Sequence, residues 1–254
     1  MSYEFLKTKA EDGIVRITLN RPPVNVLNIP MMEEMVEAFK WAKDQEGCLV
    51  VIDAEGKAFS AGVDVGDHTP EKVDKMIDVF DRLFEAMNEV EKPIVAVVQG
   101  AALGGGYEVV LYCDLVVASE KASFGQPEIQ VGVFPPPASY ALPRMLTWPK
   151  AMELLLSGDT INATRAEELG LVNTVLPADN FAEGAEDYLK KYTKLSPVVL
   201  SLTKKAVKAG LNKDFKNGIK EIDSIYLNEL MKTEDAVEGL NAFMEKRKPE
   251  WKGK

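Results

Sequence analysis

Two glutamates stand in surroundings that suit acid–base chemistry. Glu108 follows three glycines at 104–106, which come after an apolar segment and open a predicted helix. Glu128 follows Pro127 and lies between Phe124 and the apolar residues of 129–134. A carboxylate among apolar neighbours loses solvation, which raises its pKa toward a range useful for proton transfer. Two such carboxylates facing one substrate could activate water and move a proton.

The glycine run could also stabilise negative charge. Adjacent glycines let the backbone approach a ligand closely, and the free N–H groups of a helix N-terminus favour an anion there. An oxyanion that develops during a reaction fits this description. The run matches neither a phosphate loop nor the dinucleotide fingerprint. Taken alone, the glycines are also consistent with a tight helix–sheet turn, and Glu128 with a solvated loop residue.

Other catalytic groups are scarce. His68 is the only histidine and its neighbours indicate a loop, so we expect neither a Ser–His–Asp triad nor a metal site. Cys48 and Cys113 lie in apolar runs and are predicted to be buried free thiols.

The composition limits the possible partners. The chain has 254 residues, of which 46% are hydrophobic, and a net charge of −10. This charge argues against nucleic acid and anionic membranes, and an anionic ligand must be held by local lysines or backbone N–H groups. No apolar run approaches the ~20 residues of a membrane span. No signal peptide is evident at the N-terminus, so a cytoplasmic location is the default expectation.

The elements that must position the two glutamates alternate between strand and helix. Strand patterns occupy 14–19, 49–52, 94–98 and 115–118, and helical patterns occupy 30–42, 71–90 and 107–112. Apolar strands alternating with helices predict an α/β fold with a largely parallel sheet and right-handed crossovers. A last strand is expected at 172–176, and 180–247 reads as nearly all helix. We place an architectural boundary at 195, which gives a core of 1–195 and a helical region of 196–254.

Several segments together resemble the enoyl-CoA hydratase/isomerase (crotonase) superfamily over nearly the whole chain. They are Leu19-Asn20-Arg21-Pro22, Phe59-Ser60-Ala61-Gly62-Val63-Asp64-Val65, the stretch 100–108, Cys113-Asp114-Leu115-Val116-Val117-Ala118, Phe124-Gly125-Gln126-Pro127-Glu128-Ile129 and the stretch 163–172. The resemblance implies a spiral of ββα units and a C-terminal helical trimerisation region. It also implies a trimer or dimer of trimers that binds acyl-CoA thioesters. Coenzyme A is then part of the substrate, and no cofactor is expected.

The resemblance also implies roles for individual residues. The N–H groups of Val63 and Gly105 would form an oxyanion hole that polarises the thioester carbonyl. Glu108 and Glu128 would hold the water, and between them remove one proton and deliver another. Which glutamate is the base stays open. Contacts to the substrate and its CoA portion would come from Val24, Val26, Ala61, Asp64, Val65 and Gly104.

The chain departs from the family pattern after Glu128. Prolines at 135–137 remove three N–H donors and stiffen the expected pocket wall of Phe134, Pro136 and Tyr140. Gly66 stands where the family usually has lysine. The segment 126–137 resembles the dienoyl-CoA hydratases of anaerobic aromatic breakdown, which hydrate cyclohexa-1,5-diene-1-carboxyl-CoA, and a rigid wall suits a flat ring.

Four alternatives remain open at this stage. They are a straight-chain enoyl-CoA hydratase, a double-bond isomerase, a ring-opening or C–C-cleaving acyl-CoA hydrolase and a non-catalytic acyl-CoA-binding protein. The absence of a carboxylate at 135–139 counts against the isomerase. Retention of both glutamates beside the glycine run counts against the binding protein.

Overall fold

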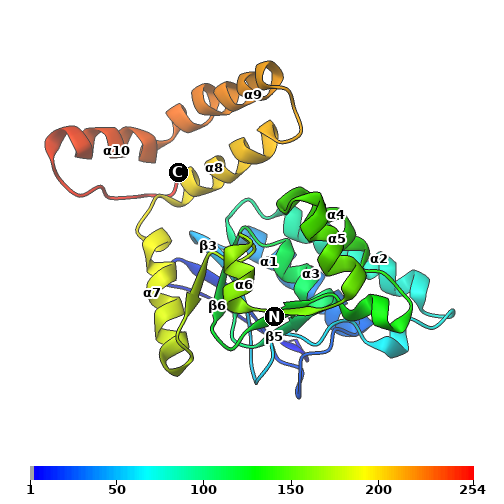
Figure 1. Cartoon of the computed structure of the whole chain (residues 1–254). Coiled ribbons are helices and arrows are strands. Elements are labelled where there is room, and N and C mark those ends of the chain that lie inside the picture. Colours follow the sequence, from blue (N-terminus) through cyan, green and yellow to red (C-terminus); the bar gives the residue numbers. More distant parts are fainter. Residues whose placement is uncertain (1–2) are drawn as a thin grey trace.

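A computed structural model describes residues 3–254 (Figure 1). Its larger sheet has six strands in the order β1-β2-β3-β4-β6-β9, and every neighbouring pair is parallel except the antiparallel β1–β2 hairpin. The bounds are β1 (Leu6–Glu11), β2 (Ile14–Leu19), β3 (Leu49–Ala54), β4 (Ile94–Val98), β6 (Leu115–Ser119) and β9 (Thr174–Leu176). The largely parallel sheet predicted from the sequence is therefore confirmed.

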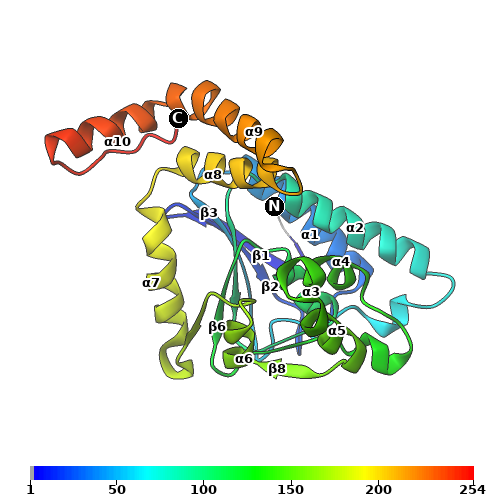
Figure 2. The ribbon, with the colours of Figure 1, turned by 45° about the horizontal axis from the view of Figure 1, so that its top comes forward.

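The central strands are apolar on both faces because helices cover both faces. Val50 and Ile52 of β3 point into one core, whereas Leu49 and Val51 point into another. The first core is closed by α1 (Ile29–Asp44) and α2 (Val73–Glu89), and the second by α7 (Phe181–Thr193). Figure 2 shows the sheet between these helices. Two-sided burial explains why β3 and β4 read as continuous apolar runs.

A second sheet of three strands follows the strands of the first sheet along the chain. It contains β5 (Ala101–Leu103), β7 (Ser123–Gly125) and β8 (Thr160–Asn162) in the order β5-β7-β8. The chain passes from β4 to β5 and then into α3 (Gly105–Leu111), and from β6 to β7 and then toward α4 (Pro136–Met145). Each passage is a ββα unit with one strand in each sheet. The strands β5, β7 and β8 of this second sheet were not predicted, because they are too short to show an alternating pattern.

The remaining short elements connect these units. They are η1 (Val65–Asp67), η2 (Pro127–Val131), α5 (Trp148–Ser157), α6 (Ala163–Glu168) and η3 (Ala178–Asn180). Among the described residues, no helix is both long and apolar enough to cross a membrane.

Three helices beyond α7 form an arm, defined here as residues 197–254, that stands away from the sheets (Figures 1 and 2). It comprises α8 (Pro197–Gly210), α9 (Phe215–Asn228), η4 (Leu230–Lys232) and α10 (Glu234–Glu245). On α8, Lys204 Nζ lies 2.6 Å from an Asp114 carboxylate oxygen, and Lys208 Nζ donates to the Asn88 carbonyl at 2.7 Å. These contacts fasten only α8 to the core.

The C-terminal tail returns to the start of the arm. Asp235 is 1% exposed and accepts hydrogen bonds from Ser196 Oγ at 2.6 Å, Lys252 N at 2.7 Å and Gly253 N at 3.1 Å. Trp251 Nε1 donates to the Lys194 carbonyl at 2.9 Å. The buried carboxylate thus joins the first turn of α10, the N-cap of α8 and the tail.

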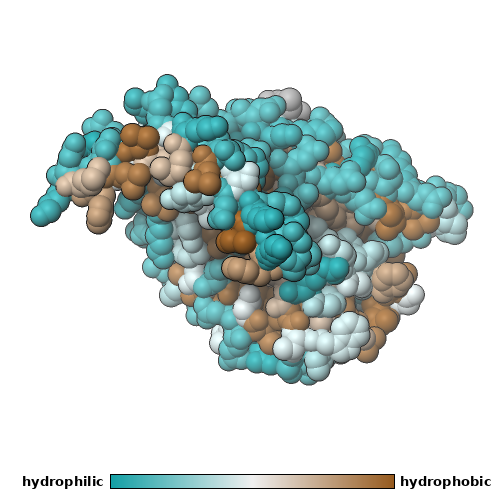
Figure 3. Space-filling model, turned by 90° about the horizontal axis from the view of Figure 1, so that it is seen from above, coloured by the Kyte–Doolittle hydropathy of each residue, from teal (hydrophilic) through white to brown (hydrophobic). Residues whose placement is uncertain are grey.

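Much apolar surface of the arm is uncovered. Figure 3 shows apolar patches on it, at the upper left of that view. The exposed large apolar residues of the arm are Val207, Leu211, Phe215, Tyr226, Leu227, Met231, Val237, Leu240, Phe243 and Met244. They occupy all three helices and the turns between them.

Candidate active site

The glycine-containing segments 59–65 and 100–108 lie against each other at one end of the strands of the larger sheet. They follow β3 and β4, which are parallel neighbours, so both leave the sheet at the same end. There they pair with each other: Phe59 N donates to the Ala101 carbonyl, and Leu103 N donates to the Ser60 carbonyl, both at 2.9 Å. The strand topology therefore brings together two motifs that lie some forty residues apart in the sequence.

The backbone amides of Val63 and Gly105 lie close together. Gly105 is the first residue of α3, so its N–H has no acceptor within the helix. A side-chain carbon added to Gly105 would lie 3.4 Å from Val63 N and 2.5 Å from Val63 Cγ2. Within residues 3–254, neither amide donates to a backbone or side-chain acceptor. Both N–H groups are therefore free to donate to a ligand.

Glu108 is held in the first turn of α3 and is 2% exposed. Its Oε1 accepts a hydrogen bond from Ala138 N, at the start of α4, at 2.9 Å. Burial raises the pKa of Glu108 to about 8; the Ala138 N–H opposes this shift and the nearby Glu128 carboxylate adds to it. A carboxyl group with this pKa can exchange a proton near neutral pH.

Glu128 lies in η2 with its carboxylate against the glycine run. A side-chain carbon at Gly104 would lie 2.6 Å from Glu128 Oε1, and Gly104 has a φ of +50°, which favours glycine. Burial raises the pKa of Glu128, while its own backbone N–H and the His68 ring act in the opposite direction. The two carboxylates are near enough to interact, since Glu128 contributes to the raised pKa of Glu108.

Loss of solvation raises the pKa of Glu128, as the sequence predicts, but some of the residues around the carboxylate differ from those expected. The apolar residues that follow Glu128 do not enclose it: Val131 is 71% exposed and Phe134 is 67% exposed. The carboxylate packs against Gly104 and Gln126. Neighbours in a tight helical turn point in different directions, so sequence proximity did not imply contact.

Two residues near Glu128 were not identified as site residues from the sequence. Gln126 is 1% exposed, and when its amide is oriented to pair donors with acceptors, its nitrogen lies 3.1 and 3.2 Å from the two Glu128 oxygens. His68 Nδ1 lies 3.0 Å from the Asp64 carbonyl, and the ring is within electrostatic range of Glu128. Gln126 could have been suspected from its place in the Glu128 motif, whereas nothing in the sequence connects His68 with that motif.

The segments expected to contact the CoA portion lie side by side. Ala61 N donates to the Val24 carbonyl, and Asp64 N donates to the Leu27 carbonyl, both at 2.9 Å. Val65 is exposed at the start of η1. Residues 24–27 and 61–65 therefore lie side by side, and Val63 is part of the second segment.

The three residues expected in the pocket wall lie at the surface. Phe134, Pro136 and Tyr140 are all exposed, around the N-terminal half of α4. The Arg144 guanidinium stacks 3.6 Å from the centre of the Tyr140 ring. The structure therefore does not enclose them in a pocket.

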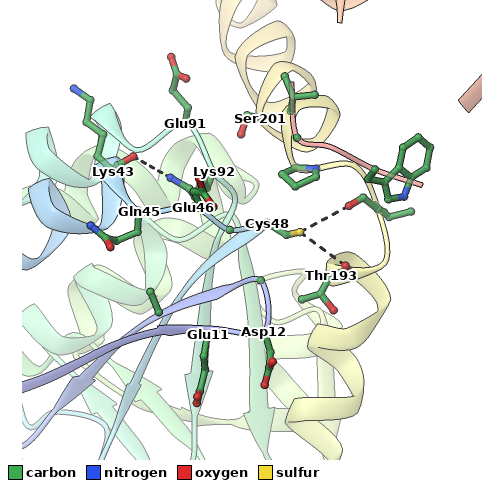
Figure 4. Close-up of a pocket in the computed structure, with 18 of the residues that line it drawn as sticks. Glu11, Asp12, Lys43, Gln45, Glu46, Cys48, Glu91, Lys92, Thr193 and Ser201 are labelled. Atoms are coloured by element: carbon green, nitrogen blue, oxygen red, sulfur yellow. Dashed lines mark hydrogen bonds between the residues drawn. The ribbon is translucent and has the colours of Figure 1, made fainter. Parts of the chain in front are cut away.

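A large cleft of about 1300 Å³ lies at the opposite end of the strands (Figure 4). The β1–β2 turn, the end of α1 and the tail of the arm line it. Its lining residues include Cys48 before β3, Lys92 before β4 and Trp251 in the tail. Cys48 Sγ faces the carbonyls of Thr193 and Leu195 at 3.9 and 3.7 Å, and burial raises the pKa of this thiol. Both cysteines are free, Cys48 buried and Cys113 half-buried. None of the site residues predicted from the sequence lines this cleft.

Comparison with known proteins gives consistent matches along the chain. The sequence model described as enoyl-CoA hydratase/isomerase matches residues 9–254. A Dictyostelium discoideum protein described as a probable mitochondrial enoyl-CoA hydratase is 35% identical, over 97% of this chain and 90% of that protein. The cyclohexa-1,5-dienecarbonyl-CoA hydratase of Thauera aromatica is 34% identical, over 96% and 95% of the two chains. A crystal structure of an enoyl-CoA hydratase from Bacillus anthracis superimposes with a TM-score of 0.93 at 30% identity, over 99% and 100% of the two chains.

Proposed function

The chain belongs to the enoyl-CoA hydratase/isomerase family and has its crotonase fold, and from that premise we propose that it hydrates a cyclic dienoyl-CoA with Glu108 and Glu128 as its acid–base pair. Its activity is that of an enoyl-CoA hydratase, a hydro-lyase. The proposal adds the acyl group and the residues that carry the chemistry.

The observation that carries the proposal is the arrangement of two carboxylates around two free amides. Val63 N–H and Gly105 N–H would bind the thioester oxygen, and their hydrogen bonds would strengthen as negative charge develops on it. Because Gly104 lacks a side chain, the carboxylate of Glu128 packs against the glycine run and would lie beside this oxygen site. A substrate carbon next to the carbonyl would then lie within reach of a carboxyl group.

The two glutamates would share one water molecule and one proton. As hydroxyl adds to the β-carbon, one carboxylate takes the proton that the water releases. The other carboxyl group gives its proton to the α-carbon, where the enolate charge had accumulated. The raised pKa values of both groups support this exchange near neutral pH.

Two observations support a cyclic acyl group. The run of prolines at 135–137 begins α4 beside Glu108 and limits the flexibility of the backbone there. The relative from Thauera aromatica, at 34% identity over nearly the whole chain, is described as a hydratase of a cyclic dienecarbonyl-CoA. A rigid wall with Phe134 and Tyr140 at its rim would favour a flat ring over a flexible chain.

The CoA portion would lie along residues 24–27 and 61–65, with contacts from Val24, Val26 and Ala61. Asp64, Val65 and Gly104 would continue these contacts to the thioester. The mechanism uses no cofactor besides the coenzyme A of the substrate. A cytoplasmic location stays a prediction, since one relative is described as mitochondrial.

The exposed apolar residues of the arm support an assembly of several copies. We propose a homotrimer, or a dimer of trimers, in which the arm of one chain covers apolar surface of its neighbours. An uncovered apolar surface of this extent is unusual for a monomer.

The function is tested by assaying hydration of cyclohexa-1,5-diene-1-carboxyl-CoA beside crotonyl-CoA. We expect faster turnover of the cyclic diene, and a loss of about 10²–10⁴ in kcat in both Glu108→Gln and Glu128→Gln. Glu85→Gln, which changes an exposed carboxylate on α2, serves as the control. Preference for crotonyl-CoA would remove the cyclic substrate but keep the mechanism. Wild-type rates in either glutamine variant would refute the acid–base pair.

A further inference from the structure

The start of α4 is aimed at Glu108, and prolines occupy most of it. Pro135 is the N-cap residue, and Pro136 and Pro137 are the first two residues of the helix. The first N–H of the helix therefore belongs to Ala138, which is buried and donates to Glu108 Oε1 at 2.9 Å. The next N–H, that of Ser139, is already bonded to the Pro135 carbonyl at 2.9 Å. One donor remains for the glutamate.

The N-terminus of a helix without these prolines would offer this carboxylate more N–H donors. The first N–H groups of a helix have no intrahelical acceptor and converge on an acceptor placed at its N-terminus. Glu108 occupies that place, but proline has no N–H, so two of these donors are missing. Across the described residues, no protein donor reaches Glu108 Oε2.

We propose that Pro136 and Pro137 are positioning residues, which withhold N–H donors so that Glu108 is anchored through Oε1 alone and presents Oε2 to the reacting water. This inference rests on the proposed role of Glu108. A second or third N–H at the start of α4 would compete with the water for Oε2. It would also stabilise the carboxylate and so weaken its affinity for a proton.

The surroundings of Glu108 make this effect measurable. The titratable groups that interact with it are Glu128 from η2 and Tyr112, the C-cap residue of α3. Substitution of a proline in α4 changes neither group. A change in the pH at which Glu108 ionises would then indicate the number of N–H donors at the start of α4.

The experiment replaces each proline in turn by alanine, which restores an N–H without adding a polar side chain. Pro137→Ala restores the donor next to Ala138, and Pro136→Ala, at an exposed position, restores the one before it. Pro143→Ala, in the second half of the same helix, is the matched control. The readout is kcat and KM as a function of pH, on an enoyl-CoA that the wild type hydrates.

We expect Pro137→Ala to move the Glu108 ionisation in the kcat/KM profile to lower pH by about 0.5–1 unit, the effect of one added hydrogen bond to a carboxylate. kcat should fall while KM stays unchanged, and Pro136→Ala should show a smaller shift in the same direction. Pro143→Ala should keep the wild-type profile.

Profiles of Pro137→Ala and Pro136→Ala that coincide with the wild type would overturn the inference. Glu108→Gln separates this failure from that of the proposed function. If Glu108→Gln is inactive and the proline variants titrate normally, Glu108 keeps its role and the prolines lose theirs. If Glu108→Gln is fully active, both proposals fail.

Discussion

At Gly104 a single missing side chain leaves room for the Glu128 carboxylate, only 2.6 Å from where a side-chain carbon would be. The same residue has a positive φ, so glycine is required there for two separate reasons. The effect of the positive φ can be separated from the effect of limited space, because Gly170 also has a positive φ but has open space around it.

We predict that Gly104→Ala and Gly170→Ala each lower the free energy of unfolding by about 1–2 kcal/mol, from backbone strain. Only Gly104→Ala should also lower the hydration rate, by about 10², because Glu128 must move away from the amides. Denaturant unfolding and steady-state kinetics of the two variants test this. Equal rates in the two variants would show that the position of Glu128 does not depend on Gly104.

The burial of Glu108 predicts a dependence of stability on pH. Below about pH 4.5 the carboxyl group is protonated in both the folded and the unfolded chain. Between there and a pKa of about 8 only the unfolded chain loses the proton, so the free energy of unfolding falls as pH rises. Glu108→Gln has no such ionisation.

Glu108→Gln should therefore gain stability relative to the wild type between pH 5 and pH 8, by roughly 1–4 kcal/mol. Denaturant unfolding at both pH values measures the difference. Glu85→Gln, which removes an exposed carboxylate, should follow the wild type. A constant difference between Glu108→Gln and the wild type would mean that Glu108 ionises normally in the folded chain.

At the scale of elements, the arm depends on one buried carboxylate. Asp235, in the first turn of α10, accepts hydrogen bonds from Ser196 at the N-cap of α8 and from Lys252 and Gly253 of the tail. Its removal would leave the buried Ser196 hydroxyl and two part-buried N–H groups of the tail unpaired, and an unpaired buried donor is costly. The neighbouring Glu234 pairs only with exposed lysines of the tail.

We predict that Asp235→Ala lowers the free energy of unfolding by about 2–4 kcal/mol. Amide hydrogens of α8 and α10 should exchange faster, whereas those of β3 and β4 should not change. Glu234→Ala should leave both measurements nearly unchanged, because its ion pairs are exposed to solvent. Unaltered exchange in α8 and α10 of Asp235→Ala would show that the tail does not fasten the arm.

At the scale of the molecule, the exposed apolar residues of the arm predict self-association. Phe243 is 84% exposed on α10, far from Glu108 in the sequence and outside the core. A large apolar side chain at this exposure is expected to lie in an interface between copies. The proposed trimer or dimer of trimers would have three or six times the 28.0 kDa of one chain.

Sedimentation equilibrium of the wild type should give one of these two masses. Phe243→Ser should shift the distribution toward smaller species, whereas Lys220→Ser, at an exposed polar position on α9, should not. A wild-type chain that sediments as a monomer at micromolar concentration would contradict the proposed assembly.

The sequence by itself determined the α/β class, the long helices and the family. Apolar runs such as Leu49–Ala54 must be buried on both faces, and helical spacing repeats over many residues, so both patterns survive without knowledge of distant contacts. The motifs around Gly105 and Glu128 were likewise local and could be read directly. The division at residue 195 and the roles of the site residues stay predictions.

Only the tertiary structure decided what surrounds each glutamate. In the part of the chain that the structure describes, the single donor to Glu108 comes from Ala138, thirty residues away, and Gly104 lies against the Glu128 carboxylate. Burial, hydrogen bonding and pKa depend on atoms within a few ångströms. Those atoms come from different strands and helices, whose arrangement is fixed by the packing of the whole chain.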